Sequence, residues 1–449
     1  MAQGPWSGRR LHFVGIGGAG MSGLALVARA LGAAVTGSDR AESAYMETLR
    51  AEGIEPVVGH DAANVPEGAE VVVSTAIGED NPELAAAARV LHRGDLLAEV
   101  SRLKPCIAVS GTHGKTTTAC MAAHVMLEAG RAPSYLIGGE LRTTGRNADW
   151  ADGEWLVVEA DESDRSFLKL APDVAVVTNV ELDHHATYRS QRELEEAFER
   201  FAEQAGTTIA WALTHIPSPR TYGIRGGEVR ATDVELGRGG SRFVALDQEF
   251  RLQIPGAHNV LNALAALLAC QEAGVPPRES AAALATFPGA GRRFEHRGRT
   301  VAGAAVYDDY AHHPTEVRAT LEAARTLEPR RLIACFQPHL YSRTERLARD
   351  FGRALALADA SCVLDVYPAR ERAEDHPGVS GWLVAAAAAD ASGGRPVYWT
   401  PGMDDAERLL LSLLRDGDVL LTLGAGDVDR LAARLVARPP AEPVGSGAR

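Results

Sequence analysis

Two glycine-rich segments restrict the fold of this chain more than any other feature. The first, GIGGAG from Gly15 to Gly20, follows a short apolar run at residues 11–14. The second, GTHGKTT from Gly111 to Thr117, follows an apolar run at residues 105–109. Apolar residues recur at helical spacing behind both segments, so each is predicted to join a strand to a helix. Such turns are typical of α/β folds with parallel strands, and they bind phosphate groups at the start of the helix.

The alternation of strands and helices starts three times along the chain. It restarts near residues 101–104 and again after a Pro- and Gly-containing linker at 287–291. With 449 residues, the chain is too long for one ordinary core. The stretch 206–255 is polar and irregular, and we expect short antiparallel strands there. The expected domains are residues 1–102, 103–290 and 291–436, followed by a disordered tail at 437–449.

The composition is that of a globular protein and excludes several classes of function. Hydrophobic residues make up 46% and charged residues 23% of the chain. The formal net charge of −13 is spread along the sequence, which argues against general binding of nucleic acid. No apolar run approaches the roughly 18 residues that span a bilayer, and the N-terminus lacks the apolar core of a signal peptide. We therefore expect a cytoplasmic protein without membrane association, whose five scattered cysteines are reduced core thiols.

The second glycine segment has the residues that a nucleoside triphosphate requires. Backbone N–H groups at the start of a helix can surround phosphate oxygens, while Lys115 can reach the β and γ phosphates and Thr116 can offer its hydroxyl to Mg²⁺. The standard P-loop has a further glycine where this chain has Val109, so the motif is a shorter form. A strand–helix turn with an incidental lysine is the alternative. The predicted ATP-binding residues are Gly111, Thr112, His113, Gly114, Lys115, Thr116 and Thr117.

Acidic residues follow the two strands expected after this turn. Glu159 and Asp161 come at the end of the run 154–158, and period-two geometry puts both on one side of the strand. Asp183 and His184 end the next strand in the same way. Carboxylates at strand ends beside a P-loop are typical ligands of Mg²⁺, which prefers oxygen. An acidic turn and a structural histidine are the alternatives, but two acidic strand ends in series favour a metal site.

Polar side chains near the end of the second domain are candidates for nucleotide contacts. His258 and Asn262 are four residues apart near an expected helix at 259–270, so both can face one ligand. Side-chain amides suit adenine or ribose edges, although an Asn near a helix start is often only a cap. The pair Arg292 and Arg293 follows the linker and suits phosphate, with a solvated basic turn as the alternative.

Two polar clusters end strands of the third domain. The first is DDYAHHP at residues 308–314, and the second is QPHLYSRT at residues 337–344. Two acids, a phenol and two imidazoles directly after a strand are difficult to explain as a solvated loop. Ligands of open α/β sheets bind at the carboxyl ends of the strands, which is where these clusters are expected.

These motifs together resemble those of the Mur ligase family, and within it the alanine-adding members. The resemblance covers nearly the whole chain, and the strings HFVGIGGAGMSGLA and DDYAHHPTEV are specific to the alanine-adding members. The matching segments, in family order, are GIGGAGMSGLA from Gly15, GTHGKTTT from Gly111, EADESD from Glu159, DH at Asp183, HNVLNALAA from His258, RRF from Arg292, DDYAHHPTEV from Asp308, QPHLYSRT from Gln337 and VYPARE from Val366.

The resemblance implies a fold and a reaction. The fold is α/β with three domains: an N-terminal Rossmann-like domain for a UDP-sugar, a central P-loop ATPase-like domain with a mostly parallel sheet, and a C-terminal Rossmann-like domain for an amino acid. The reaction is the ATP-dependent joining of L-alanine to the lactyl carboxylate of UDP-N-acetylmuramate through an acyl phosphate, in peptidoglycan precursor synthesis. ATP is a substrate and Mg²⁺ a cofactor, and the enzyme is expected to be a monomer or a homodimer.

The resemblance also implies roles for the residues around the second glycine segment. Lys115, Glu159 and His184 would form the catalytic group. Thr116 would hold Mg²⁺ together with Glu159 and His184. Lys115 and the metal would neutralise charge on the transferring phosphoryl group.

The remaining substrate contacts are implied in the same way. Asn259 and Arg293 would approach the nucleotide. His312 and Arg343 would help to bind L-alanine, and Asp39 would lie near the uridine end of the sugar nucleotide. The glycines expected to receive the UDP diphosphate are Gly15, Gly17, Gly18 and Gly20.

Some features leave alternatives open. The segments near 85–91 and 206–222 are shorter than is usual in the family, and Leu340 stands where some relatives have arginine. A murein-peptide ligase of cell-wall recycling would use the same sugar nucleotide with a preformed peptide. A nicotinamide-dependent oxidoreductase would explain the first glycine segment and Asp39, but not Lys115. A non-catalytic regulator that binds UDP-sugars is the last alternative.

Overall fold

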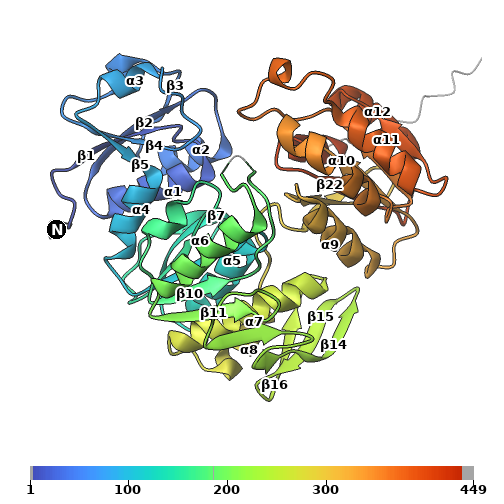
Figure 1. Cartoon of the computed structure of the whole chain (residues 1–449), viewed down its shortest axis with the longest axis horizontal. Coiled ribbons are helices and arrows are strands. Elements are labelled where there is room, and N and C mark those ends of the chain that lie inside the picture. Colours follow the sequence, from blue (N-terminus) through green and yellow to red (C-terminus); the bar gives the residue numbers. More distant parts are fainter. Residues whose placement is uncertain (1–3, 186, 437–449) are drawn as a thin grey trace, which may run out of the picture. The chain divides into compact units, whose positions relative to one another are not determined.

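The computed structural model describes residues 4–185 and 187–436, which form two compact units (Figure 1). The first unit contains the residues up to Glu235 together with Ser241–Gln253 and His258–Gly291. The second contains Leu236–Gly240, Ile254–Ala257 and the residues from Arg292 onward. The domain limits expected from the sequence stay predictions, and the predicted tail at 437–449 lies outside the described residues.

A five-stranded sheet carries the first glycine segment. Its order is β3-β2-β1-β4-β5, and all its pairings are parallel. Because β1 lies between β2 and β4, the turn after β1 opens where the strand order reverses, and ligands of open α/β sheets bind at that point. The predicted Rossmann-like fold is therefore confirmed here. The elements are β1 (Arg10–Val14), α1 (Ala19–Ala30), β2 (Ala34–Asp39), α2 (Ala44–Ala51), β3 (Val57–Val58), η1 (Ala62–Asn64), β4 (Glu70–Val73), α3 (Pro82–Ala85), β5 (Arg89–His92) and α4 (Arg93–Ser101).

An eight-stranded sheet carries the second glycine segment. Its order is β13-β12-β11-β10-β6-β9-β7-β8, and its pairings are parallel except for β7 with β8. The predicted mostly parallel central sheet is thus confirmed. Its strands are β6 (Cys106–Ser110), β7 (Ser134–Leu141), β8 (Arg146–Asp149), β9 (Leu156–Glu159), β10 (Val174–Val177), β11 (Thr207–Trp211), β12 (Arg220–Gly223) and β13 (Val229–Arg230). The helices are α5 (Lys115–Glu128), η2 (Ser166–Lys169), α6 (Gln191–Glu203), α7 (Ala257–Glu272) and α8 (Pro277–Leu284).

The prediction of antiparallel strands over residues 206–255 is wrong for its first half. There, β11, β12 and β13 extend the central sheet by parallel pairing. Only later does an antiparallel pair form, between β15 (Gly240–Ala245) and β16 (Gln248–Leu252), in a small sheet with β14 (Thr232–Gly237). β12 and β13 pair in parallel with the strands just before them (Ile209 with Arg220, Tyr222 with Val229), and a local polar pattern does not distinguish such pairing from a hairpin.

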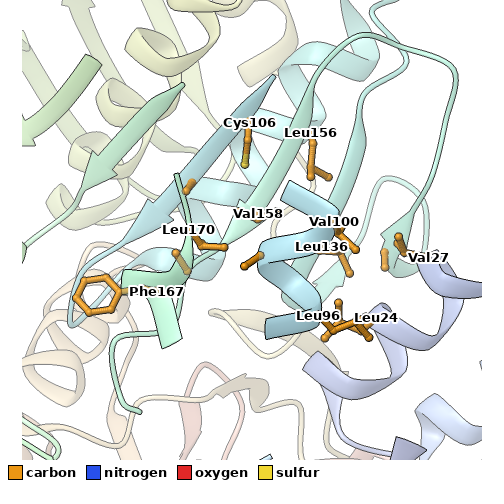
Figure 2. Packing of buried hydrophobic residues seen from close by; sticks show 14 of the residues in the cluster. Leu24, Val27, Leu96, Val100, Cys106, Leu136, Leu156, Val158, Phe167 and Leu170 are labelled. Carbon is orange, nitrogen blue, oxygen red and sulfur yellow. The ribbon is translucent and has the colours of Figure 1, made fainter. Parts of the chain in front are cut away.

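One hydrophobic cluster joins the five-stranded and eight-stranded sheets. Leu24 and Val27 of α1 and Leu96 and Val100 of α4 belong to the same buried cluster as Leu136 of β7 (Figure 2). Helix α1 also packs against β7 and β8. Burial of each such side chain contributes about 1.5–3 kcal/mol, so the cluster holds the two sheets together as one unit.

The second unit contains a six-stranded sheet of order β17-β18-β22-β19-β20-β21, parallel except for β17 with β18. The third predicted α/β fold is thereby confirmed. Its strands are β17 (Glu295–Arg299), β18 (Ala305–Asp309), β19 (Leu332–Phe336), β20 (Ala360–Val363), β21 (Val397–Trp399) and β22 (Val419–Leu423). Its helices are α9 (Pro314–Arg325), α10 (Tyr341–Leu355), η3 (Ala373–Asp375), α11 (Gly381–Ala391), α12 (Met403–Leu413) and α13 (Asp429–Val436).

Two other expectations concern the whole chain. Among the described residues, no helix is both long enough and apolar enough to cross a membrane. The cysteines are free and buried, as predicted: Cys106, Cys120, Cys270, Cys335 and Cys362.

Candidate active site

The second glycine turn connects β6 to α5 in a conformation that favours glycine. Gly111 has φ 137° and Gly114 has φ 81°, both in the left-handed region. A Cβ on Gly111 would lie 2.0 Å from Thr178 Oγ1, so the turn also packs too closely for a side chain. Gly114 is the N-cap of α5 and makes no side-chain cap hydrogen bond. Backbone N–H groups at such a helix start are suited to phosphate.

Lys115 is the first residue of α5 and carries the positive charge of this turn. Its Nζ donates to the carbonyl oxygens of Gly111, at 2.6 Å, and Thr112, at 3.2 Å. The same Nζ lies 2.8 Å from Glu162 Oε2. Burial alone would lower the pKa of Lys115, but the nearby carboxylates, with that of Glu162 strongest, outweigh it and raise the pKa. The lysine therefore stays charged, as stabilisation of phosphate oxygens requires.

Glu159 lies at the end of β9, directly beside the turn. Its Oε1 accepts a hydrogen bond from Thr116 Oγ1 at 3.1 Å, and its Oε2 accepts one from the backbone N–H of Gly138 at 2.7 Å. The carboxylate and the hydroxyl predicted to hold a metal are thus adjacent. Both are oxygen donors of the kind that Mg²⁺ prefers.

Glu162 is a site residue to which the sequence analysis assigned no role. Its side chain is 1% exposed, and its Oε1 lies 3.4 Å from Nε2 of His184. Glu162 therefore links Lys115 to His184. The period-two argument that selected Glu159 and Asp161 could not find it, because β9 ends at Glu159 and the chain turns away after it.

The end of β10 supports the glycine turn from the other side. The Thr178 hydroxyl donates to the carbonyl oxygen of His113 at 2.6 Å, and Asn179 Oδ1 accepts from the His113 N–H at 2.8 Å. Thr112 Oγ1 donates to the carbonyl oxygen of Glu181 at 2.9 Å. These bonds hold the turn in place, so Thr112 and His113 have structural contacts in addition to their predicted nucleotide contacts.

The start of α7 lies against the same turn. Asn262 Oδ1 accepts from Thr118 Oγ1 at 3.3 Å, and its Nδ2 donates to Asn259 Oδ1 at 3.2 Å. A Cβ on Gly114 would come within 2.5 Å of Asn262 Oδ1. Asn262 is therefore occupied in packing against the turn, and Asn259 beside it stays the predicted nucleotide contact.

The first glycine turn is closed by an acid from the end of β2. The backbone N–H of Gly17 donates to Asp39 Oδ2 at 2.9 Å, and the Ser43 hydroxyl donates to the Gly17 carbonyl at 2.9 Å. Gly15 adopts φ 78°, and Gly18 is the N-cap of α1 without a side-chain cap hydrogen bond. Asp39 thus stabilises the turn through Gly17, and its predicted contact with the uridine end of the sugar nucleotide stays a prediction.

In the second unit, the adjacent Arg292 and Arg293 both lie over the Tyr310 ring, but Arg292 also has a set of hydrogen-bond partners. Arg292 Nε donates to Asp308 Oδ2 at 2.9 Å, and its Nη1 and Nη2 donate to the carbonyl oxygens of Gly426 and Gly424. Arg292 is therefore used to join β18 to the turn after β22. The Arg293 guanidinium lies over the Tyr310 ring, 4.9 Å from its centroid, and its predicted nucleotide contact stays a prediction.

The residues predicted to bind an amino acid gather at the carboxyl ends of β18 and β19. His312 and His339 have ring centroids 6.0 Å apart, and Arg343 Nη1 lies 3.2 Å from His339 Nδ1. Nearby, burial raises the pKa of Asp309 to about 6, against the opposing effect of Arg293. His339 was part of a quoted motif but had no assigned role.

Comparisons with known proteins agree over nearly the whole chain. Family models match residues 10–104 (Mur ligase family, catalytic domain), 109–270 (Mur ligase middle domain) and 292–426 (Mur ligase, glutamate ligase domain). The UDP-N-acetylmuramate–L-alanine ligase of Streptomyces coelicolor is 47% identical, with 95% of this chain and 97% of the relative covered. The enzyme of the same name from Rubrobacter xylanophilus is 44% identical, with 96% and 100% covered.

Solved structures show the same relationship. The UDP-N-acetylmuramate-alanine ligase of Thermotoga maritima matches with a TM-score of 0.84 at 29% identity, covering 95% of this chain and 98% of that chain. A murein peptide ligase from Psychrobacter arcticus matches with a TM-score of 0.72 at 26% identity and the same coverage.

Proposed function

This chain belongs to the Mur ligase family, and we propose that it joins L-alanine to the lactyl carboxylate of UDP-N-acetylmuramate in a reaction that consumes ATP. The observation that carries this proposal is the charged Lys115 at the second glycine turn, held by Glu162, which also contacts His184. The choice of substrates is supported by the relatives of that activity, which align with this chain over almost their full length.

The chemistry has two steps. In the first, an oxygen of the lactyl carboxylate bonds to the γ-phosphorus of ATP, the bond from that phosphorus to the β–γ bridging oxygen breaks, and ADP leaves. In the second, the amine of L-alanine bonds to the acyl carbon, the bond to the phosphate oxygen breaks, and the amine loses a proton. Lys115 and the N–H groups of the turn stabilise the charge on the transferring phosphoryl group.

The residues around the second glycine turn fit a magnesium ion. Thr116 Oγ1 and Glu159 Oε1 are neighbouring oxygen donors, and His184 Nε2 lies 3.4 Å from Oε1 of Glu162. We propose that Thr116, Glu159 and His184 hold the ion. When bound, Mg²⁺ would neutralise part of the phosphate charge.

The second unit is proposed to bind the amino acid. Arg343 offers a planar guanidinium that suits the α-carboxylate of L-alanine, and His312 lies at the same sheet edge. Asn259 and Arg293 are proposed to contact the nucleotide. The glycines of the first turn are proposed to receive the diphosphate of the sugar nucleotide, with Asp39 toward the uridine.

The proposal is tested by measuring phosphate release with each substrate omitted in turn. We expect release only when ATP, UDP-N-acetylmuramate and L-alanine are all present. Equal release without the sugar nucleotide or without the amino acid would contradict it.

The structural match to a murein peptide ligase gives a second candidate function. An enzyme of that kind would accept a preformed peptide in place of L-alanine. Comparing L-alanine with the tripeptide L-alanyl-γ-D-glutamyl-meso-diaminopimelate as acceptor separates the two, and we expect turnover with free L-alanine.

A further inference from the structure

Arg93 lies between the two glycine turns, although it belongs to neither motif. It is the first residue of α4, in the part of the chain that forms the five-stranded sheet. Its Nη2 donates to Asp161 Oδ2 at 2.6 Å and to Asp164 Oδ2 at 3.0 Å, both of which follow β9 in the eight-stranded sheet. A single guanidinium nitrogen thus connects α4 to the acidic segment beside Lys115.

The other end of the guanidinium faces the first glycine turn. A Cβ built on Gly20 would lie 3.4 Å from Arg93 Nη1, so Nη1 stands beside the first turn of α1. The N-cap of α1 is Gly18, which is exposed and supplies no side-chain cap. Helix starts of this kind bind phosphate through backbone N–H groups, and a guanidinium beside one adds paired donors for the same oxygens.

The surroundings keep Arg93 charged and held in one orientation. Burial by itself would lower its pKa, but Asp161 and Asp164 outweigh that effect and raise the pKa. Burial likewise would raise the pKa of Asp161, whereas Arg93 and then Lys115 lower it. Asp161 directly precedes Glu162, whose carboxylate lies 2.8 Å from Lys115 Nζ, so this short segment contacts both the guanidinium at the first turn and the lysine at the second.

We propose that Arg93 binds the diphosphate of the sugar nucleotide through Nη1 while Asp161 and Asp164 hold Nη2, so that occupation of the first turn is coupled to the ATP site. This inference rests on the proposed function, because it needs a nucleoside diphosphate at the first turn. A diphosphate that engages Arg93 competes with Asp161 and Asp164 for the guanidinium, and so acts on the segment whose Glu162 pairs with Lys115. Coupling between two sites is reciprocal, so ATP binding then also affects sugar-nucleotide affinity.

The first test measures the equilibrium binding of UDP and of uridine by calorimetry, without ATP or L-alanine. Arg93→Met removes the guanidinium, and we expect UDP affinity to fall roughly 10- to 100-fold, as for loss of a charged hydrogen bond, with uridine affinity unchanged. Arg93→Lys keeps a positive charge beside Asp161 and Asp164 but loses the paired donors of the guanidinium. This variant should fold even where Arg93→Met does not. We expect Arg93→Lys to lose UDP affinity as well, by a smaller factor.

Lys169→Met is the matched control. Lys169 Nζ lies 2.6 Å from Asp95 Oδ1, and this exposed pair links α4 to η2, the helix that directly follows the segment with Asp161 and Asp164. We expect native affinity for both UDP and uridine in this variant. UDP affinity within twofold of the native value in both Arg93 variants would overturn the inference, as would equal losses for UDP and uridine.

The second test addresses the coupling. Affinity for a non-hydrolysable ATP analogue is measured with and without saturating UDP in the native enzyme and in Arg93→Lys. We expect UDP to change the analogue's affinity in the native enzyme and to change it less in the variant. An equal effect of UDP in both proteins, or none in the native enzyme, would refute the coupling. Failure of the native enzyme to bind UDP at all would instead contradict the proposed function.

Discussion

The two glycine turns of the first unit perform similar tasks with cations of different origin. Both turns start a helix at a glycine N-cap, Gly18 for α1 and Gly114 for α5, and neither has a side-chain cap. At the second turn, Lys115 directly follows the glycine in the chain. At the first turn, α4 contributes the guanidinium of Arg93.

This difference shows which residues of a binding site can be predicted from its sequence motif and which cannot. A lysine inside a turn identifies a triphosphate site, because chain neighbours stay neighbours in any fold. A cation that another helix supplies cannot be predicted from the residues of the motif itself. The sequence of the first turn therefore indicates only a generic dinucleotide-binding motif, although the Arg93 guanidinium lies beside it.

The largest effect is expected when the cation of the second turn is removed. Lys115→Met should lower kcat by about 10³-fold, since it removes the charge that stabilises the transferring phosphoryl group. It also leaves Glu162 buried without its lysine, which costs about 3–5 kcal/mol in stability. The double variant Lys115→Met, Glu162→Gln should recover stability in denaturant unfolding but not turnover. Recovery of turnover would show that Lys115 serves only to pair with Glu162.

The next largest effect is expected on the Mg²⁺ dependence of activity. We expect ligand binding at the second turn to require Mg²⁺ and UDP binding at the first turn not to require it. Glu159→Gln should raise the Mg²⁺ concentration for half-maximal activity by about 10- to 100-fold. Thr116→Ser keeps the hydroxyl and should retain the native requirement, whereas Thr116→Val should not. The measurement is initial rate against Mg²⁺ concentration at fixed ATP. UDP binding at the first turn should not depend on Mg²⁺ in any of these proteins.

A smaller effect is expected from crowding the first turn. A Cβ on Gly17 would lie 2.7 Å from Ser43 Oγ and 3.0 Å from Asp39 Oδ2. Gly17→Ala should therefore displace the turn and weaken UDP binding by about tenfold, or 1.4 kcal/mol. Adding Ser43→Ala removes the closest obstacle, so the double variant should bind UDP better than additivity predicts. ATP affinity, measured without UDP, should stay native, and a parallel loss would mean that Gly17 affects the whole unit.

The smallest effect is expected from pH, and it has opposite signs for Glu83 near the first turn and Lys115 at the second. Beneath the first turn, Glu83 is fully buried and accepts hydrogen bonds from Ser38 at 2.6 Å and Asn64 at 2.8 Å. Burial raises the pKa of Glu83, but these bonds outweigh it and lower the pKa below its ordinary value of 4.5. Burial lowers the pKa of His12 below 6.5. Both groups thus stabilise the fold above their ordinary pKa values, and this stability is lost as pH falls through the lower folded values.

The raised pKa of Lys115 has the opposite consequence. Its contribution is complete below the ordinary value of 10.5 and is lost as pH rises through the folded value. Hydrogen exchange measured from pH 7 to 4 should therefore show β1 and β2 losing protection first, by about 1.4 kcal/mol per pKa unit. In Glu83→Gln the loss below pH 4.5 should be reduced. Earlier loss of protection in β6 and α5 would contradict this assignment.

Local sequence was sufficient for the turns and for the acids next to strand ends. The apolar runs before Gly15 and Gly111 predicted β1 and β6, and the glycine–lysine order predicted the phosphate-binding geometry around Lys115. Glu159 was found because it ends a strand. Each of these inferences uses residues separated by only a few peptide bonds, where backbone geometry limits the possible arrangements.

The tertiary structure alone decided which distant residues complete each site. Glu162 reaches Lys115 because the chain turns after β9, and β11–β13 join the central sheet by pairing with strands that no local pattern specifies. Arg93 stands at the first turn because α1 and α4 are buried together against the eight-stranded sheet. Hydrophobic burial is non-directional, so an apolar pattern shows that a helix will pack but not against what, and the charges it carries to a site become known only with the fold.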